Sequence, residues 1–154
     1  IEPLWGGIAV LEPFCRAVGD LDVEFVLTVG GGDLSLLGEL PANVVPVDHV
    51  PLGPLLSTCS GVVHHGGSTT TTTAMSFGLP QCVIANGRGP RINQEALIAW
   101  GAGIGARAES VGVAECRALL EDEGLRAAAH GIREEMAVMP EPAALVPYLV
   151  DLTG

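Results

Sequence analysis

Short apolar runs alternate with segments of helical length along the chain, and this alternation constrains the fold more than any other feature. The clearest run, Gln81 to Ala85 (Q-C-V-I-A), lies between two helix-like segments. Continuous apolar runs are typical of strands buried on both faces, and their alternation with helices favours a parallel sheet. We therefore expect an α/β fold, a Rossmann-like, doubly wound parallel sheet with helices on both faces. The predicted strands are residues 23–29, 44–47, 61–64, 81–85 and 103–106, and the predicted helices are residues 8–18, 68–77, 92–100, 111–121, 124–138 and 142–151, with shorter helical pieces within 34–40 and 51–59.

Composition and charge exclude several classes of protein. The 154 residues suffice for one domain, and 48% hydrophobic with 16% charged residues excludes intrinsic disorder. No apolar run approaches the roughly 20 residues of a membrane span, and no signal peptide is visible, so we expect a cytoplasmic protein. The net charge of −11 repels nucleic acids and anionic lipid, so neither is an expected partner.

Four cysteines, at positions 15, 59, 82 and 116, are widely spaced and form no C-x-x-C pair. This spacing does not suit a zinc site or a disulfide scaffold. Free thiols in a reducing compartment are the preferred interpretation.

Ligands of doubly wound sheets bind beyond the carboxyl ends of the strands, which directs attention to the predicted loops 30–33, 64–70 and 86–91. The second of these loops is the most informative. There Val62 leads through His64, His65, Gly66 and Gly67 into Ser68 and a run of five threonines. Glycines allow close approach to a ligand, and the free N–H groups of the following helix make an anion site that could hold a diphosphate without lysine.

Other interpretations of this stretch stay open or are weakened by the sequence. A strand–Gly–Gly–helix turn is also common in α/β proteins without any ligand. Adjacent histidines on a strand point to opposite faces, so no metal site is expected. The chain lacks a G-x-S-x-G motif for a triad hydrolase and a G-x-G-x-x-G dinucleotide motif.

Four segments together resemble a known family. They are Asn43 to Gly67, Gly78 to Gln81, Trp100 to Gly103, and Met139 to Pro142 before a last helix. They resemble the C-terminal, donor-binding half of GT-B glycosyltransferases that attach deoxysugars to antibiotic aglycones. The resemblance covers nearly the whole chain.

The resemblance implies a role for particular residues. Thr73 stands where related plant enzymes carry a glutamate for the ribose hydroxyls, and a short threonine suits a deoxyribose, which favours a TDP-sugar over a UDP-sugar. His49 could stack on the base or be an ordinary loop histidine. The implied diphosphate-binding residues are His65, Gly66, Gly67, Ser68, Thr69 and Thr70, and the implied base- and ribose-binding residues are His49, Val50, Leu52 and Thr73.

The sequence also departs from the family pattern. Thr69 replaces a frequent glycine, and Gly89-Pro90 stands where many members carry an Asp-Gln pair for the donor sugar. Asn93 and Gln94 could substitute only with a shifted register. Arg88 and Arg91 flank the gap and could reach phosphate or lie on the surface. Arg88, Asn93 and Gln94 are therefore the candidates for the donor-sugar region.

The expected domain, residues 1–154, binds the nucleotide-sugar donor, and the resemblance places the acceptor-binding domain and catalytic base outside this chain. No catalytic residue is expected here, and no cofactor or metal beyond the TDP- or UDP-sugar. The expected function is the donor half of an inverting glycosyltransferase acting on a small-molecule natural product. The alternative is a non-catalytic nucleotide-binding module or degenerate partner subunit. A third possible function is that of a related fold that binds UDP-sugars for epimerisation or cell-wall synthesis. The acceptor, the sugar, the bond type and a homodimeric state stay open.

Overall fold

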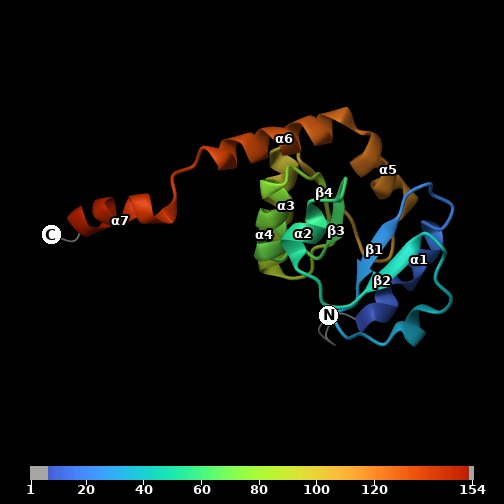
Figure 1. Cartoon of the computed structure of the whole chain (residues 1–154). Coiled ribbons are helices and arrows are strands. Elements are labelled where there is room, and N and C mark those ends of the chain that lie inside the picture. Colours follow the sequence, from blue (N-terminus) through green and yellow to red (C-terminus); the bar gives the residue numbers. More distant parts are fainter. Residues whose placement is uncertain (1–6, 153–154) are drawn as a thin grey trace.

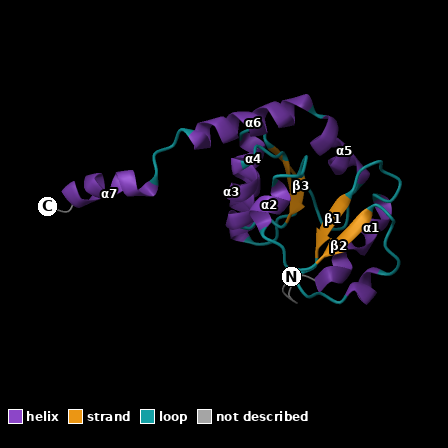
Figure 2. Cartoon of the chain, in the orientation of Figure 1, coloured by secondary structure: helices purple, strands orange, loops and turns teal. Residues whose placement is uncertain are grey.

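Residues 7–152 are described by the structure, a computed structural model, and their strands form two parallel ladders (Figures 1 and 2). Strand β1 (Phe25–Thr28) pairs with β2 (Val44–Val47), and the other ladder has the order β3 (Val62–His64), β4 (Gln81–Val83), β5 (Gly103–Gly105). The predicted α/β class, with parallel strands and helices on both sides, is confirmed. The hydrogen-bonded ladder is nevertheless interrupted between β1 and β3.

Helices connect the strands in chain order. Among the described residues, the short 3-10 helices are η2 (Gly7–Leu11) and η3 (Leu34–Leu37), and the α-helices are α1 (Glu12–Ala17), α2 (Leu52–Leu56), α3 (Ser68–Ser76), α4 (Arg88–Ala99), α5 (Val113–Glu121), α6 (Glu123–Ala137) and α7 (Pro142–Asp151). In the described part of the chain, none of these helices has the length and apolar character needed to cross a bilayer.

The largest differences from the predicted boundaries lie in the loop 86–91 and the helix 8–18. The expected loop 86–91 is much shorter, because α4 already begins at Arg88, and Pro90 lies in its first turn. Proline is tolerated there because the first-turn amides have no partner within the helix. The expected helix 8–18 is a 3-10 helix followed by the short α1, which has Pro13 in its first turn.

The central strand β4 explains where the core lies. Alternate residues of a strand point to opposite faces. Cys82 packs with Val111 and Leu119 on one face, whereas Val83 packs with Leu97 and other apolar residues on the opposite face. This ladder is therefore covered on both sides by helices.

The cysteines are all free, and Cys15, Cys82 and Cys116 are buried. Burial raises the pKa of the Cys82 thiol to about 12 and that of Cys116 to about 11. Thiols held in this way stay protonated at neutral pH and are poor nucleophiles. They act as apolar core residues.

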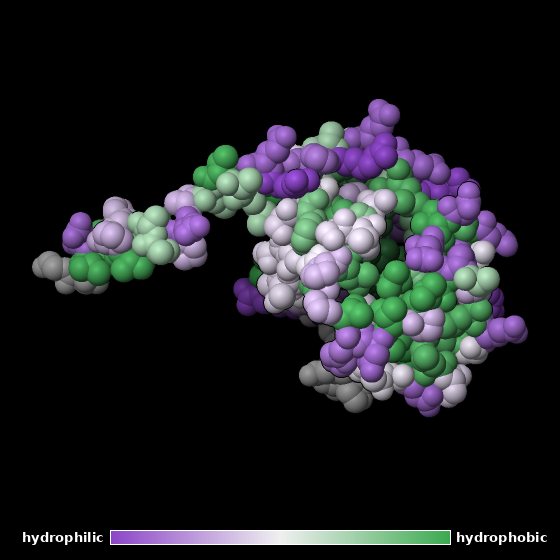
Figure 3. Space-filling model, viewed as in Figure 1, coloured by the Kyte–Doolittle hydropathy of each residue, from purple (hydrophilic) through white to green (hydrophobic). Residues whose placement is uncertain are grey.

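Helix α7 extends away from the rest of the molecule (Figure 1), and every one of its residues is exposed. Its exposed apolar side chains include Leu145, Leu149 and Val150. Figure 3 shows green surface along this end of the molecule.

Candidate functional site

The bend between β3 and α3 contains two glycines, of which Gly66 is the more constrained. Gly66 is buried and adopts a φ of +85°, a conformation that side chains rarely allow. A Cβ atom on Gly66 would lie 2.8 Å from Val83 Cγ1 and 3.0 Å from Pro90 Cβ. A Cβ atom on Gly67 would lie 2.6 Å from His65 Nε2. Gly66 is therefore required by the bend itself, whereas a side chain at Gly67 would mainly displace the exposed His65 ring.

The first turn of α3 presents open backbone donors. Its first amide to bond a carbonyl is that of Thr71, which donates to Gly67 O at 3.0 Å. No side chain caps the helix, and within residues 7–152 the amides of Ser68, Thr69 and Thr70 donate to no other group of the chain. Ser68 and Thr69 are exposed, and Thr70 is half-buried. Free amides and the positive end of the helix dipole, about half a charge, make this turn suited to an anion.

The threonine run is compatible with a helix because its hydroxyls bond backward. Thr71 Oγ1 donates to Gly67 O at 3.0 Å, Thr72 Oγ1 to Ser68 O at 2.9 Å, and Thr73 Oγ1 to Thr69 O at 2.7 Å. Such bonds satisfy the hydroxyls within the helix. The hydroxyls of Ser68, Thr69 and Thr70, one turn earlier, are the ones next to the open amides.

A buried hydrogen-bond network holds the bend in position. His64 Nδ1 accepts the Gly66 N–H at 3.1 Å, so its ring proton lies on Nε2 and is donated to Gln81 Oε1 at 2.9 Å. Gln81 is fully buried, and its Nε2 donates to Thr71 O at 3.3 Å. Burial lowers the pKa of His64 to about 4, so the imidazole is neutral at pH 7. Sequence reasoning missed this role of His64 and Gln81; a glutamine in an otherwise apolar strand was the signal.

The two adjacent histidines thus have different environments. His64 is half-buried and bonds inward, whereas His65 is exposed and its ring lies against Gly67.

Among residues 7–152 there is no cluster of three or more histidine, cysteine or acidic side chains suited to a metal ion.

The three donor-sugar candidates lie on helix α4 and differ in their contacts with the bend. Asn93 Nδ2 donates to Gly66 O at 2.8 Å and to Ser68 Oγ at 3.2 Å. Gln94 Nε2 donates to Val83 O at 2.6 Å and so supports β4. Arg88 is exposed in the first turn of α4. The structure therefore brings Asn93, but neither Arg88 nor Gln94, into hydrogen-bond contact with the bend.

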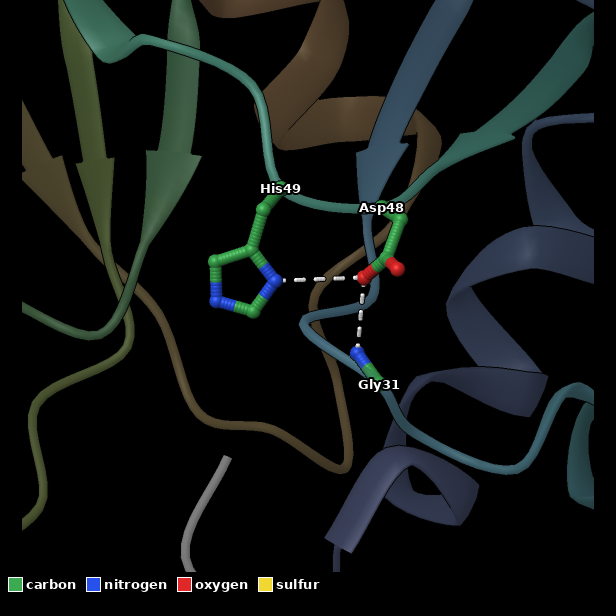
Figure 4. A network of polar contacts seen from close by, with 3 residues as sticks. All are labelled: Gly31, Asp48 and His49. Atoms are coloured by element: carbon green, nitrogen blue, oxygen red, sulfur yellow. Dashed lines mark hydrogen bonds and ion pairs between the residues drawn. The ribbon is translucent and has the colours of Figure 1, made fainter.

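The loop after β2 carries His49 and is anchored by its neighbour. The Asp48 carboxylate accepts the Gly31 N–H at 3.0 Å and lies 3.3 Å from His49 Nδ1 (Figure 4). The side chain of His49 is 86% exposed. Asp48 thereby joins the loop after β2 to the glycine turn after β1, a link that sequence reasoning did not identify.

A cavity of about 1750 Å³ connects these loops. It is lined from the β1–β2 side and from the β3–β4 side, and it reaches the carboxyl ends of the strands, where α/β proteins bind ligands. Thr73, Arg88, Asn93 and Gln94 are not among its lining residues. The predicted site residues that line it are His49, Val50, Leu52, His65 and Thr70, and Arg91 is also part of the wall.

Comparison with known proteins gives a consistent result. A curated relative, the tylactone mycaminosyltransferase of Streptomyces fradiae, is 46% identical over 141 residues, which cover 89% of this chain and 31% of the relative. The solved glycosyltransferase SnogD from Streptomyces nogalater matches with a TM-score of 0.87 and 52% identity, over 100% of this chain and 42% of that chain. The spinosyn rhamnosyltransferase SpnG, solved with thymidine diphosphate, matches with a TM-score of 0.81 and 35% identity, over 95% of this chain and 41% of that chain.

The chain thus spans about a third of the length of the curated relative it matches. The matching structures confirm the likeness to the C-terminal half of the GT-B fold. The model of the erythromycin biosynthesis protein CIII-like C-terminal domain matches residues 13–152. The chain belongs to this family of C-terminal domains from antibiotic glycosyltransferases.

Proposed function

We propose that residues 1–154 form the nucleotide-sugar donor-binding domain of an inverting glycosyltransferase. The enzyme would transfer a deoxysugar from a TDP-sugar to a natural-product aglycone. The observation that carries the proposal is the uncapped first turn of α3, beside an exposed histidine and at the rim of a large cavity. Two relatives support it, a mycaminosyltransferase and a rhamnosyltransferase that was solved with thymidine diphosphate.

The diphosphate would lie over the start of α3. The amides and hydroxyls of Ser68, Thr69 and Thr70, with the His65 imidazole, would donate to its oxygens, while Gly66 and Gly67 allow close approach. Each hydrogen bond to a charged group contributes about 1.5–3 kcal/mol. Local donors are needed here, because the chain's net charge of −11 does not attract an anion.

The same donors would serve the chemistry of transfer. In an inverting reaction, the acceptor oxygen forms a bond to the anomeric carbon as the bond to the diphosphate oxygen breaks. Negative charge then builds on the diphosphate, and fixed donors aimed at that charge lower the barrier. The acceptor proton would go to a base in the acceptor-binding part of the full-length enzyme. No catalytic residue is assigned to this chain.

The nucleoside would occupy the cavity towards β2. His49 would stack on the base, the backbone near Val50 would bond its edge, and Leu52 would pack against it. Thr73 would face a deoxyribose and favour TDP over UDP. Arg88, Asn93 and Gln94 stay assigned to the donor-sugar region, with Asn93 acting through its bonds to Gly66 and Ser68. We propose a cytoplasmic enzyme that needs no metal for binding.

Calorimetric titration of the chain with TDP and with UDP tests this proposal. We expect micromolar to millimolar binding, tighter for TDP, and the same affinity with magnesium or with a chelator. No heat and no thermal shift with either nucleotide would contradict it. Joining the chain to a matching acceptor domain and measuring sugar transfer then distinguishes a transferase half from a non-catalytic module. The Gly89-Pro90 pair favours the second candidate, and inactivity with intact TDP binding would support it.

A further inference from the structure

One face of α4 lies against the bend between β3 and α3. Helices α3 and α4 are neighbours (Figure 1). Residues three and four positions apart share a helix face, so Pro90, Asn93 and Leu97 lie together on α4. Leu97 is buried and packs with Val83 of β4, which fixes this face against the sheet. A Cβ atom on Gly66 would lie 3.0 Å from Pro90, so the bend is in close contact with the same face.

The hydrogens of the Asn93 amide can be assigned from its neighbours. Asn93 Nδ2 lies 2.8 Å from Gly66 O and 3.2 Å from Ser68 Oγ. A carbonyl oxygen only accepts, so the atom that faces Gly66 O is the amide nitrogen and not the amide oxygen. This nitrogen carries two hydrogens and accepts none. One hydrogen therefore bonds Gly66 O, and the other bonds Ser68, whose hydroxyl oxygen is the acceptor.

The hydrogen of the Ser68 hydroxyl must then point away from Asn93. A serine hydroxyl has one hydrogen to donate and two acceptor positions. One turn later, Thr71 Oγ1 donates its hydrogen to Gly67 O within the helix. In the described part of the chain, no acceptor takes the hydroxyl hydrogen of Ser68. Ser68 is exposed in the uncapped first turn, so this hydrogen is available to a ligand that lies over the turn.

We propose that Asn93 is a positioning residue that directs the Ser68 hydroxyl hydrogen toward the donor diphosphate. The inference rests on the proposed function, since it says how one donor of that site is oriented. A hydroxyl that accepts a hydrogen bond is polarised and donates more strongly. Asn93 acts without touching the diphosphate. Because the same amide holds Gly66 O, it also joins the orientation of the hydroxyl to the position of the bend.

A double-mutant cycle tests the proposal. Asn93→Asp keeps the side-chain shape but replaces the donating amide by a carboxylate, which accepts the Ser68 hydrogen and withdraws it from the diphosphate. Calorimetric titration with TDP compares the unchanged chain, Ser68→Ala, Asn93→Asp and the double variant. We expect Ser68→Ala alone to weaken TDP binding at least about threefold. When Asn93→Asp is already present, Ser68→Ala should change the affinity little.

A neighbouring position supplies a matched control for charge. Ile92 follows Arg91 on α4 and is 56% exposed. Ile92→Asp adds the same negative charge to the same part of the helix but leaves both hydrogen bonds of Asn93 in place. It should weaken TDP binding by repulsion only. Ser68→Ala should therefore keep its full effect when combined with Ile92→Asp, which separates lost orientation from repulsion.

Three results would overturn the proposal. One is an equal fold-loss from Ser68→Ala with and without Asn93→Asp, and another is no effect of Ser68→Ala in a chain that binds TDP. No TDP binding by the unchanged chain would overturn the proposed function as well, so the two failures are distinguishable. If Asn93→Asp does not fold, Asn93→Ala replaces it in the cycle. The effect of Ser68→Ala should still shrink, and an undiminished effect would overturn the proposal.

Discussion

The two ladders differ in how they are supported. Every residue of β4 is buried, and helices cover both faces of the β3–β4–β5 ladder. In the β1–β2 ladder, Val26 and Val45 are 37% and 38% exposed, and β1 lines the large cavity. The bend that carries the open amides belongs to the well-supported ladder, whereas the His49 loop extends from the other. The proposed diphosphate site therefore lies on the more buried ladder, and the proposed base site lies on the more exposed one.

The largest expected effect tests the difference in core packing. Leu97→Ala should lower the free energy of unfolding by about 2–5 kcal/mol, because Leu97 is 1% exposed and a cavity would remain. Val45→Ala should change it by about 0.5 kcal/mol or less, as at most surface positions. Denaturant titration of both variants measures this. Equal losses would remove the distinction between the ladders.

Two glycines of positive φ offer a matched comparison. Gly66→Ala combines backbone strain with a collision against Val83 and Pro90 and should cost about 2–4 kcal/mol. Gly30, with a φ of +54°, has no atom within 4 Å of the added Cβ, so Gly30→Ala should cost only about 1–2 kcal/mol. Thermal unfolding distinguishes them. If Gly30→Ala proved as damaging, close packing at the bend would not be the cause.

His64 should make the supported ladder sensitive to acid. Burial lowers its pKa from 6.5 to about 4, so between these values the unfolded chain binds a proton that the folded chain excludes. The free energy of unfolding therefore falls as pH falls through this window, by about 3 kcal/mol at most. His64→Asn keeps an acceptor for the Gly66 amide and should reduce this dependence. Denaturant titrations from pH 7 to pH 4 compare the two proteins, and identical profiles would contradict the assignment.

The smallest effect concerns the choice of nucleotide. Thr73→Glu supplies a carboxylate that can accept hydrogen bonds from ribose hydroxyls, as a charge-assisted pair. The UDP dissociation constant divided by that of TDP should fall by a few fold. Stability should change little, because Thr73 is only half-buried and its hydroxyl bonds within the helix to Thr69 O. Parallel calorimetric titrations measure the ratio. An unchanged ratio would remove Thr73 from the proposed ribose site.

Much of the fold could be predicted from the sequence because its signals are local. The apolar runs predicted all five strands, and the sequence Gly66-Gly67-Ser68 predicted the bend and the helix that follows. The start of α4 was missed because Gly87, Gly89 and Pro90 are typical of a loop, although proline also fits a first helical turn. The separation into two ladders could not be predicted, since strand pairing depends on contacts distant in the sequence.

For the candidate site, too, local features could be predicted from the sequence, whereas contacts between distant residues could not. The open amides of Ser68, Thr69 and Thr70 follow from a helix that begins after a residue without a side chain. The bonds of His64 to Gln81 and of Asn93 to Gly66 join residues 17 and 27 positions apart, and no local pattern indicates them. Sequence reasoning therefore indicates the residues of the proposed site, whereas the contacts that hold those residues in place depend on the fold.

The central claim is that free amides at the start of α3 bind the diphosphate, and Ser68 allows a direct test. Gly67, at φ −63° and ψ 137°, has the extended conformation that precedes proline, so Ser68→Pro removes one amide without breaking the helix. Ser68→Ala removes only the hydroxyl and is the control. Calorimetric titration with TDP should give at least a tenfold weaker affinity for Ser68→Pro than for Ser68→Ala, matching about 1.5 kcal/mol for a lost charge-assisted bond. Equal affinities in the two folded variants would contradict the claim.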